Sequence, residues 1–391
     1  MRSGSEALGV EIENGAGTRD GWRSWWSRPQ GGPANLLTVA LSEGRPNVDL
    51  GFQALLPAAV RTVDYCKVRP DERVVVYTDS HRSPALAEAF YAACVARGFE
   101  VILVRALVQG VGTDPPPSAV AAMTDADLVF DLVAVPWSDY APAINGILAS
   151  GTRVLAVNVP DQSFVDRPPD PDVLRRVDAL EDLFTHSTEV HVTSPEGTDL
   201  WAYLKEGTLD TARGFVWEPG QWDSYGVYGV HTASHIEEEM RGTVYFNGPM
   251  ILLPGHEFVI SRPIKVQIES GRIVEIEADH PEAQLLSRWM KGWDDEGVYM
   301  ISHLGLGLDP RARVDNHRDP PFLHDCEWES INGAAVLGFG TKTMTNKGDE
   351  VRRSRGHLDA VVLGTTVAFD GRTIVEEGSF TDGSGLGPEV R

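Results

Sequence analysis

The stretch Gly356-His-Leu-Asp-Ala-Val-Val-Leu363 decides how the C-terminal half of this chain is interpreted. Its apolar, partly β-branched residues predict a strand, and residues two apart on a strand point to the same side. His357 and Asp359 therefore present an imidazole and a carboxylate to one side of the expected sheet. They could supply two of the three ligands of a 2-His-1-carboxylate iron site. A structural hydrogen bond is the more common use of an isolated His–Asp pair, so the interpretation depends on its surroundings.

A third ligand has to come from elsewhere, and His303 is the best candidate. It lies in the stretch Val298-Tyr-Met-Ile-Ser-His-Leu-Gly-Leu-Gly-Leu308, whose apolar residues predict a second buried strand. Three such ligands on one face of an iron ion would leave coordination positions open for a substrate and O₂. We therefore expect Fe²⁺ as the cofactor, bound by His303, His357 and Asp359.

Two other groups compete for a metal. His231 and His235 would lie one turn apart on a helix and could share zinc, ahead of the acidic residues 237–239. The zinc-peptidase pattern needs a Glu directly after its first His, and Thr232 stands there instead, so a solvated acidic stretch is favoured. In the other group, His317, His324 and Cys326 surround a proline-rich segment, which predicts a loop at the rim of a site. A contact of His324 with substrate is one possible role for that loop.

Two further segments have compositions that suit a binding site. Glu218-Pro-Gly-Gln-Trp-Asp223 predicts a turn with two carboxylates beside Trp222, or an ordinary surface turn filled by the indole. Residues 332–341 are rich in glycine, which lets a ligand approach the backbone closely; a bulged core strand is the alternative.

Before these segments the chain alternates between helices and short apolar strands. We predict helices over residues 49–68 and 85–97, the second with Ser83 as its N-cap and Pro84 in its first turn. We also predict a parallel sheet built from the strands 73–78, 101–104, 128–133 and 154–157. No Gly-x-Gly-x-x-Gly motif or P-loop is present, so a nucleotide cofactor is not supported. An amphipathic helix over residues 172–186 would connect this region to the next.

After this helix the pattern changes to alternating strands, with a hairpin turn at Ser270-Gly271 and one helix over residues 281–293. The expected fold class is therefore an α/β region followed by an α+β region. We predict three parts: a tryptophan-containing N-terminal extension over residues 1–33, a parallel-sheet α/β domain over 34–187, and a β-rich domain over 188–391 that carries the metal site.

Composition excludes several classes of function. The 391 residues carry a net charge of −23, which disfavours nucleic acids and anionic membrane surfaces as partners. No apolar run is long enough to span a bilayer, and the first residues lack the apolar core of a signal peptide. Three widely spaced cysteines, Cys66, Cys94 and Cys326, fit a reducing compartment, so we expect a cytoplasmic protein.

These motifs together resemble the 2,5-dihydroxypyridine 5,6-dioxygenases, iron(II) ring-cleaving enzymes that share a fold with aminopeptidase T-type metallopeptidases. The resemblance extends from about residue 74 onward and is carried by residues 299–312, Gly356-His-Leu-Asp359 and Glu218-Pro-Gly-Gln-Trp-Asp223, in that family's order. It implies His303, His357 and Asp359 as iron ligands and Glu218 as an acid near the substrate. It also implies O₂ and a small hydroxylated N-heterocycle as reactants, with cleavage of the ring, and a homo-oligomer.

The substrate-binding residues depart from the family pattern. Tyr140 falls nearest a family His thought to reach a neighbouring active site, Gly340 replaces a Ser beside Thr341, and Ser224 replaces the His after Trp-Asp. We expect the acid-base group to be Glu218, Tyr140 or His324, and the substrate contacts to include Thr341, Gly340 and Trp222. The alternative is an aminopeptidase T-like enzyme with two metals, which is weaker because His303 stands where those enzymes have a metal-binding Glu.

Overall fold

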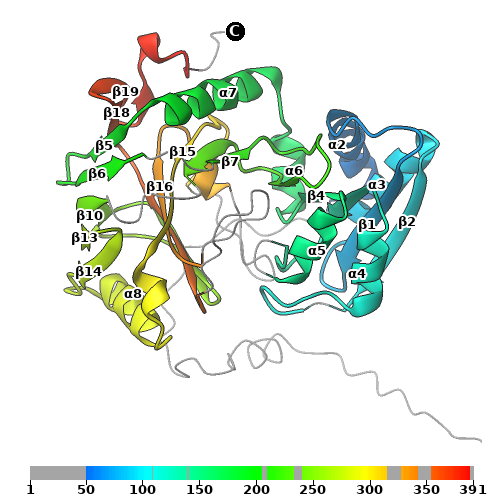
Figure 1. Ribbon diagram of the computed structural model, residues 1–391, viewed down its shortest axis with the longest axis horizontal. Coiled ribbons are helices and arrows are strands. Elements are labelled where there is room, and N and C mark those ends of the chain that lie inside the picture. Colours follow the sequence, from blue (N-terminus) through cyan, green and yellow to red (C-terminus); the bar gives the residue numbers. More distant parts are fainter. Residues whose placement is uncertain are drawn as a thin grey trace, which may run out of the picture. The chain divides into compact units, whose positions relative to one another are not determined.

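The computed structural model describes residues 50–107, 109–138, 141–204, 209–232, 240–314, 327–341 and 354–387. These residues belong to one compact unit that begins after Thr38. They form one parallel sheet and two antiparallel sheets, so the expected order of an α/β region followed by an antiparallel region is confirmed (Figure 1). The predicted N-terminal extension lies outside the described residues, and the boundary at residue 187 remains a prediction.

The first sheet has five parallel strands in the order β2-β1-β3-β4-β8. Its four N-terminal strands are those predicted from the apolar runs, and β2 forms one edge. The strands are β1 (Arg73–Asp79), β2 (Glu100–Ala106), β3 (Leu128–Asp131), β4 (Arg153–Ala156) and β8 (Trp222–Ser224).

Helices cover both faces of this sheet (Figure 1). Val74 and Val76 of β1 point into a core with α2 and α3, whereas Val75 and Tyr77 point into a core with α4 and α5. Ser83 caps α3 as expected, because its side chain accepts a hydrogen bond from the N–H of Ala85. The helices of this region are α2 (Phe52–Tyr65), α3 (Pro84–Ala96), α4 (Pro117–Thr124), α5 (Ala143–Ala149), α6 (Asp161–Asp166) and α7 (Pro171–His186).

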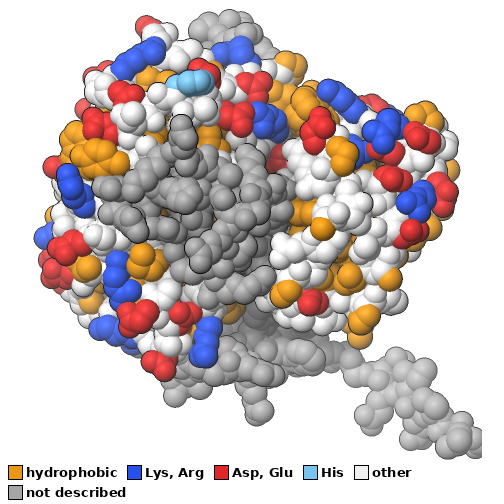
Figure 2. Space-filling view, viewed as in Figure 1, with side chains coloured by type: hydrophobic (Ala, Val, Ile, Leu, Met, Phe, Trp, Pro, Cys, Tyr) orange, Lys and Arg blue, Asp and Glu red, His pale blue; other side chains and the backbone are white. Residues whose placement is uncertain are grey.

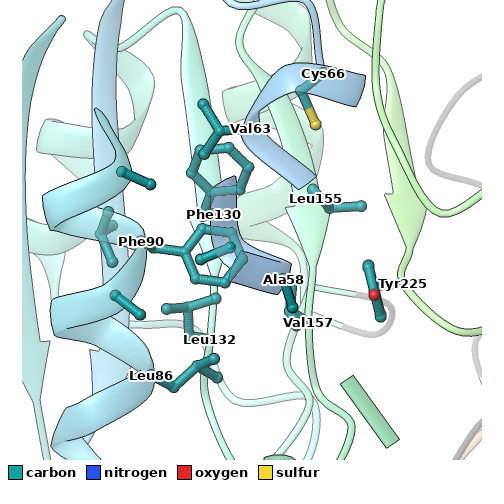
Figure 3. Close-up of a cluster of buried hydrophobic side chains, with 14 of the residues drawn as sticks. Ala58, Val63, Cys66, Leu86, Phe90, Phe130, Leu132, Leu155, Val157 and Tyr225 are labelled. Atoms are coloured by element: carbon teal, nitrogen blue, oxygen red, sulfur yellow. The ribbon is translucent and has the colours of Figure 1, made fainter. Parts of the chain in front are cut away.

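Aromatic side chains fill the core beneath α2 and α3 (Figure 3). The ring of Phe90 on α3 lies 4.8 Å from that of Phe130 on β3, and 5.4 Å from that of Phe164 on α6. Tyr225, directly after β8, lies 4.9 Å from Phe164 and donates a hydrogen bond to its carbonyl oxygen. This core therefore joins segments that are far apart in the sequence.

The fifth strand, β8, corrects one prediction. Residues 218–223 were expected to form a turn within the β-rich domain, but only the first of them do so. The chain turns at Gly220, whose φ is +73° and where a Cβ would lie 2.8 Å from the Leu148 carbonyl oxygen. Trp222 then enters β8 beside Val154 of β4. A three-residue strand leaves too short a hydrophobic pattern to be recognised in the sequence.

The other two sheets are antiparallel. The eight-stranded sheet has the order β14-β13-β10-β6-β5-β18-β19-β20, and its predicted hairpin is confirmed, with φ of +46° at Ser270 and +69° at Gly271. Its strands are β5 (Glu189–Thr193), β6 (Asp199–Tyr203), β10 (Arg241–Phe246), β13 (Ile264–Glu269), β14 (Arg272–Ile276), β18 (Thr366–Phe369), β19 (Arg372–Glu376) and β20 (Ser379–Phe380).

The seven-stranded sheet has the order β12-β11-β17-β16-β15-β9-β7. One of its faces packs against the eight-stranded sheet, where Phe339 meets Phe246 edge-on with ring centroids 6.3 Å apart. Its strands are β7 (Leu209–Ala212), β9 (Gly229–Thr232), β11 (Pro249–Leu253), β12 (His256–Val259), β15 (Ile301–Gly307), β16 (Ala335–Gly340) and β17 (His357–Val362). The remaining elements are α8 (Pro281–Lys291) and the short 3₁₀ helices η2 (Glu296–Tyr299), η3 (Trp328–Ser330) and η4 (Asp382–Ser384).

A buried ion pair connects the two regions. The guanidinium of Arg167, just after α6, lies 2.9 Å from a carboxylate oxygen of Asp309 and donates to the carbonyl oxygen of Gly226. Both side chains are almost completely buried, and each has a second ionic partner: Arg311 lies 2.8 Å from Asp309, and Glu327 lies 3.6 Å from Arg167.

The surface carries charges of both signs. On the face seen in Figure 2, Asp and Glu side chains are interspersed with Lys and Arg over the coloured surface. Among the described residues, none of the helices combines the length and the apolar character that crossing a membrane requires.

Candidate metal centre

Three neighbouring strands bring the predicted ligands together. β16 lies between β15 and β17, and Gly338 of β16 pairs with His303 on one side and with Asp359 on the other. Residues opposite each other on paired strands share a face of the sheet. His303 and Asp359 therefore point to the same face, on either side of a residue that has no side chain. His357, two residues before Asp359, joins them on that face.

A β-bulge gives His303 its direction. Ile301 pairs with Phe339, which points to the apolar face, and the register shifts before His303 pairs with Gly338. On a regular strand, Ile301 and His303 would lie on the same face because they are two residues apart; the register shift places them on opposite faces. The bulge thus keeps Ile301 in the core and turns His303 towards Asp359.

The carboxylate of Asp359 lies between the two imidazoles. Its Oδ1 is 3.1 Å from Nε2 of His357 and 3.2 Å from Nε2 of His303. One ligand atom from each of the three residues lies within 4.8 Å of the others. Burial alone would raise the pKa of Asp359, but the imidazoles of His357 and His303 hold that pKa well below its usual range. The carboxylate is therefore ionised, as a metal ligand must be.

A backbone carbonyl fixes the orientation of His357. Its Nδ1 lies 2.9 Å from the carbonyl oxygen of Thr341. Because a carbonyl oxygen only accepts hydrogen bonds, Nδ1 is the donor, which leaves Nε2 as the nitrogen that faces Asp359 and could bind a metal. Metal-binding histidines commonly have such an outer hydrogen bond.

Glycines provide the space that the imidazoles occupy. A Cβ on Gly338 would lie 2.2 Å from Cε1 of His303, and one on Gly305 would lie 1.9 Å from Cδ2 of His231. The glycine-rich segment 332–341 was expected to let a ligand approach the backbone or to form a bulged core strand. In the folded chain, Gly338 of this segment accommodates the His303 ring, and Gly305 of β15 accommodates the His231 ring.

The same face carries a second group that the sequence did not reveal as such. His231 was considered as part of a helix with His235, but it lies on β9 and pairs with Gly305. His231, His303 and Glu329 have ligand atoms within 4.8 Å of one another. Alternation along β9 could have placed His231 on a sheet face, whereas no sequence pattern indicated Glu329 of η3.

The structure fits a metal at the predicted position. Nε2 of His303 is buried and has no hydrogen-bond partner among the described residues, although it lies 3.2 Å from Asp359. Two imidazoles and one carboxylate suit Fe²⁺, and also Zn²⁺ or Mn²⁺.

The other predicted site residues in the described part of the chain belong to neither group of ligand atoms. Trp222 packs in the core of the parallel sheet and donates a hydrogen bond to the Ser138 hydroxyl. Glu218 lies in an exposed turn at the start of β8. The hydroxyl of Thr341 is bound to the backbone of Ser354, and a Cβ on Gly340 would lie 2.2 Å from the Gly356 carbonyl oxygen. Tyr140, His235, His317, His324 and Cys326 lie outside the described residues.

One carboxyl group in the Trp222 segment is unusual. Asp223 is buried, and burial raises its pKa to about 8, although it accepts hydrogen bonds from the N–H groups of Arg213 and Ser224. These bonds tie β8 to the segment before it, which gives Asp223 a structural role in the parallel sheet.

The fold and the converging ligands define a protein with a parallel α/β region and an antiparallel region that presents a candidate metal centre. A family model described as 2,5-dihydroxypyridine 5,6-dioxygenase matches residues 54–382. A 2,5-dihydroxypyridine 5,6-dioxygenase of Pseudomonas putida KT2440 is 32% identical over 265 residues, covering 67% of this chain and 73% of the relative. The chain belongs to the 2,5-dihydroxypyridine 5,6-dioxygenase family, which consists of ring-cleaving dioxygenases.

Solved structures agree with this assignment. The structure of the 2,5-dihydroxypyridine dioxygenase from Pseudomonas putida KT2440 has a TM-score of 0.74 and 25% identity, covering 86% of this chain and all of the other. AmpT from Thermus thermophilus has a TM-score of 0.59 at 16% identity, covering 84% of this chain and 99% of the other. The second likeness shows the fold alone.

Proposed function

We propose that this chain is a non-haem Fe²⁺-dependent dioxygenase that opens the ring of a hydroxylated N-heterocycle, 2,5-dihydroxypyridine or a close analogue. The observation that carries the proposal is the convergence of His303, His357 and Asp359 on one face of the seven-stranded sheet. This donor set is the one that non-haem Fe²⁺ oxygenases use. Membership of the family supports the substrate class and O₂ as reactants.

In this proposal the three side chains bind the iron, and neighbouring groups of the chain fix the orientation of those side chains. Bound Fe²⁺ would supply the redox chemistry that lets O₂ react with the ring. The Thr341 carbonyl keeps His357 in one tautomer, and the bulge before His303 keeps its ring beside Asp359. A preorganised centre of this kind gains rate by placing the reactants side by side.

The proton-transfer group remains open among Glu218, Tyr140 and His324. Glu218 has its backbone N–H bound to the side chain of Gln221 and an exposed side chain, which disfavours it as a group next to Asp359. Thr341, Gly340 and Trp222 remain predicted substrate contacts. The hydrogen bonds of Thr341 and the close approach of Gly340 to the Gly356 carbonyl oxygen support a positioning role for these two residues.

Oxygen uptake by the Fe²⁺-loaded protein with 2,5-dihydroxypyridine tests the proposal. We expect Asp359→Asn, His303→Ala and His357→Ala each to lose bound iron and O₂ uptake. His280→Ala is the matched control, since His280 is as buried as His357 but lies outside both ligand groups. Full activity in any of the three ligand variants would reject the centre.

The same assay separates the alternative of an aminopeptidase T-like metallopeptidase. Such an enzyme would release amino acids from short peptides without consuming O₂. The AmpT likeness supports only a common fold, so no specific observation favours peptidase activity. We also propose a cytoplasmic homo-oligomer, for which light scattering of the purified chain measures the oligomeric state.

A further inference from the structure

His231 is a buried imidazole that the proposed function does not use. It is 5% exposed, and its Nε2 is buried with no hydrogen-bond partner among the described residues. Its ring meets that of His303 edge-on, with centroids 5.1 Å apart. A buried nitrogen without a partner costs free energy, so this site needs a compensating ligand.

A carboxylate faces the same position. Glu329 is 9% exposed and comes from η3, which is held firmly in place. Trp328 packs in an apolar core with Val336 and Val361, and the Ser330 hydroxyl donates to the Gly226 carbonyl and accepts from the N–H of Tyr228. The position of Glu329 beside the two imidazoles is therefore set by the packing around it.

The chemistry of this group is that of a divalent-cation site. Two imidazoles and one carboxylate, with ligand atoms within 4.8 Å of one another, suit Zn²⁺, Co²⁺, Fe²⁺ or Mn²⁺.

We propose that His231, Glu329 and His303 form a second divalent-cation position next to the first one. His303 belongs to both groups of ligands, so a cation in the second position competes with the first position for this imidazole. This inference goes beyond the proposed function, because it concerns cation binding without substrate or O₂.

Cobalt binding in a background without the first position tests the inference. The variant His357→Ala/Asp359→Asn lacks two of the three ligands of the first position but keeps His231, Glu329 and His303. We expect it to bind about one Co²⁺ per chain, measured by equilibrium dialysis and by visible absorption. Adding His231→Ala or Glu329→Gln should weaken binding by at least about tenfold, since even the loss of an outer hydrogen-bond partner of a ligand costs roughly 10–100-fold.

Two matched controls accompany these variants. His280→Ala and Glu282→Gln remove a buried imidazole and a buried carboxylate outside the group, and should leave Co²⁺ affinity in this background unchanged. Circular dichroism of every variant verifies folding, and Glu329→Gln preserves side-chain shape if His231→Ala does not fold. The inference is overturned if the folded background binds no Co²⁺, or if neither His231→Ala nor Glu329→Gln weakens binding. Failure of the proposed function would instead appear as absent O₂ uptake in the Fe²⁺-loaded wild type.

Discussion

The parallel sheet and the seven-stranded sheet are both buried, but they use their faces differently. Apolar side chains cover both faces of the parallel sheet, which packs helices on each side. The seven-stranded sheet has one apolar face, while the other combines an apolar cluster around Ile251, Val336 and Val361 with His231, His303, His357 and Asp359 next to glycines. Apolar packing suffices to stabilise the first arrangement, whereas the second buries polar groups that need a partner.

This difference shows how a sheet can present a polar centre without losing its register. At Gly338 the middle strand contributes hydrogen bonds but no side chain, so ligands from its two neighbours can meet above it. Substitutions in each sheet test whether metal binding depends on the seven-stranded sheet alone and stability on the core of the parallel sheet.

The largest effect is expected at Gly338. Gly338→Ala places a Cβ 2.2 Å from Cε1 of His303 and 2.6 Å from the Ser302 hydroxyl, so His303 must move away from Asp359. We expect iron affinity to fall by about a thousandfold or more, beyond the roughly 10–100-fold cost of a lost outer partner. Equilibrium dialysis with Fe²⁺ under anaerobic conditions measures the change.

Gly146→Ala is the control for this variant. Gly146 lies in α5, and a Cβ there would have no atom within 4 Å. We expect unchanged iron affinity and a gain in stability of up to about 1 kcal/mol. Equal loss of iron in both variants would show that the loss at Gly338 is not specific to the His303 ring.

In the parallel sheet, truncation of an aromatic residue should reduce stability without affecting the centre. Phe130→Ala leaves a cavity between Phe90 and the other core residues in Figure 3, at an expected cost of about 3–5 kcal/mol. Urea unfolding measures this cost, and iron stoichiometry of the folded variant should be unchanged. Leu107→Ala, at an exposed position, should change stability by less than about 0.5 kcal/mol.

A buried carboxyl group in the parallel sheet should make stability depend on pH. Burial raises the pKa of Asp131 to about 7, so the folded chain keeps a proton that the unfolded chain loses near pH 4. The unfolding free energy should therefore fall as pH rises from about 4 to about 7, by at most about 1.4 kcal/mol per pH unit from this group. Asp131→Asn should remove this part of the slope in urea unfolding. An unchanged slope would mean that Asp131 is ionised in the folded chain.

The smallest effect is expected at the start of α3. Ser83→Ala removes the hydrogen bond from the N–H of Ala85 and should cost about 1 kcal/mol of unfolding free energy. Ser83→Asp keeps an acceptor and should restore most of the loss. Neither substitution should alter iron binding, and a change in iron affinity would contradict the separation between the two sheets.

Much of the fold could be predicted because local patterns specify it. Apolar runs located β1, β3 and β4, and Ser83 with Pro84 located the start of α3. The strand β8 escaped detection because its short segment pairs with β4, far away in the sequence. For the candidate site, alternation along one strand was enough to place His357 and Asp359 together, while Glu218 was chosen from a motif and lies in an exposed turn.

The order of residues along the chain is enough to show which residue types could bind a metal and that His357 and Asp359 share a face, because alternation along a strand is a local property of the backbone. The position of His303 beside them is a property of the folded chain. That outcome depends on the order of β15, β16 and β17, on the bulge before His303 and on the space above Gly338. The approach of His231 and Glu329 to the same imidazole was likewise a tertiary outcome. Pairing between distant strands sets these distances, and the spacing of residues along the chain does not encode them.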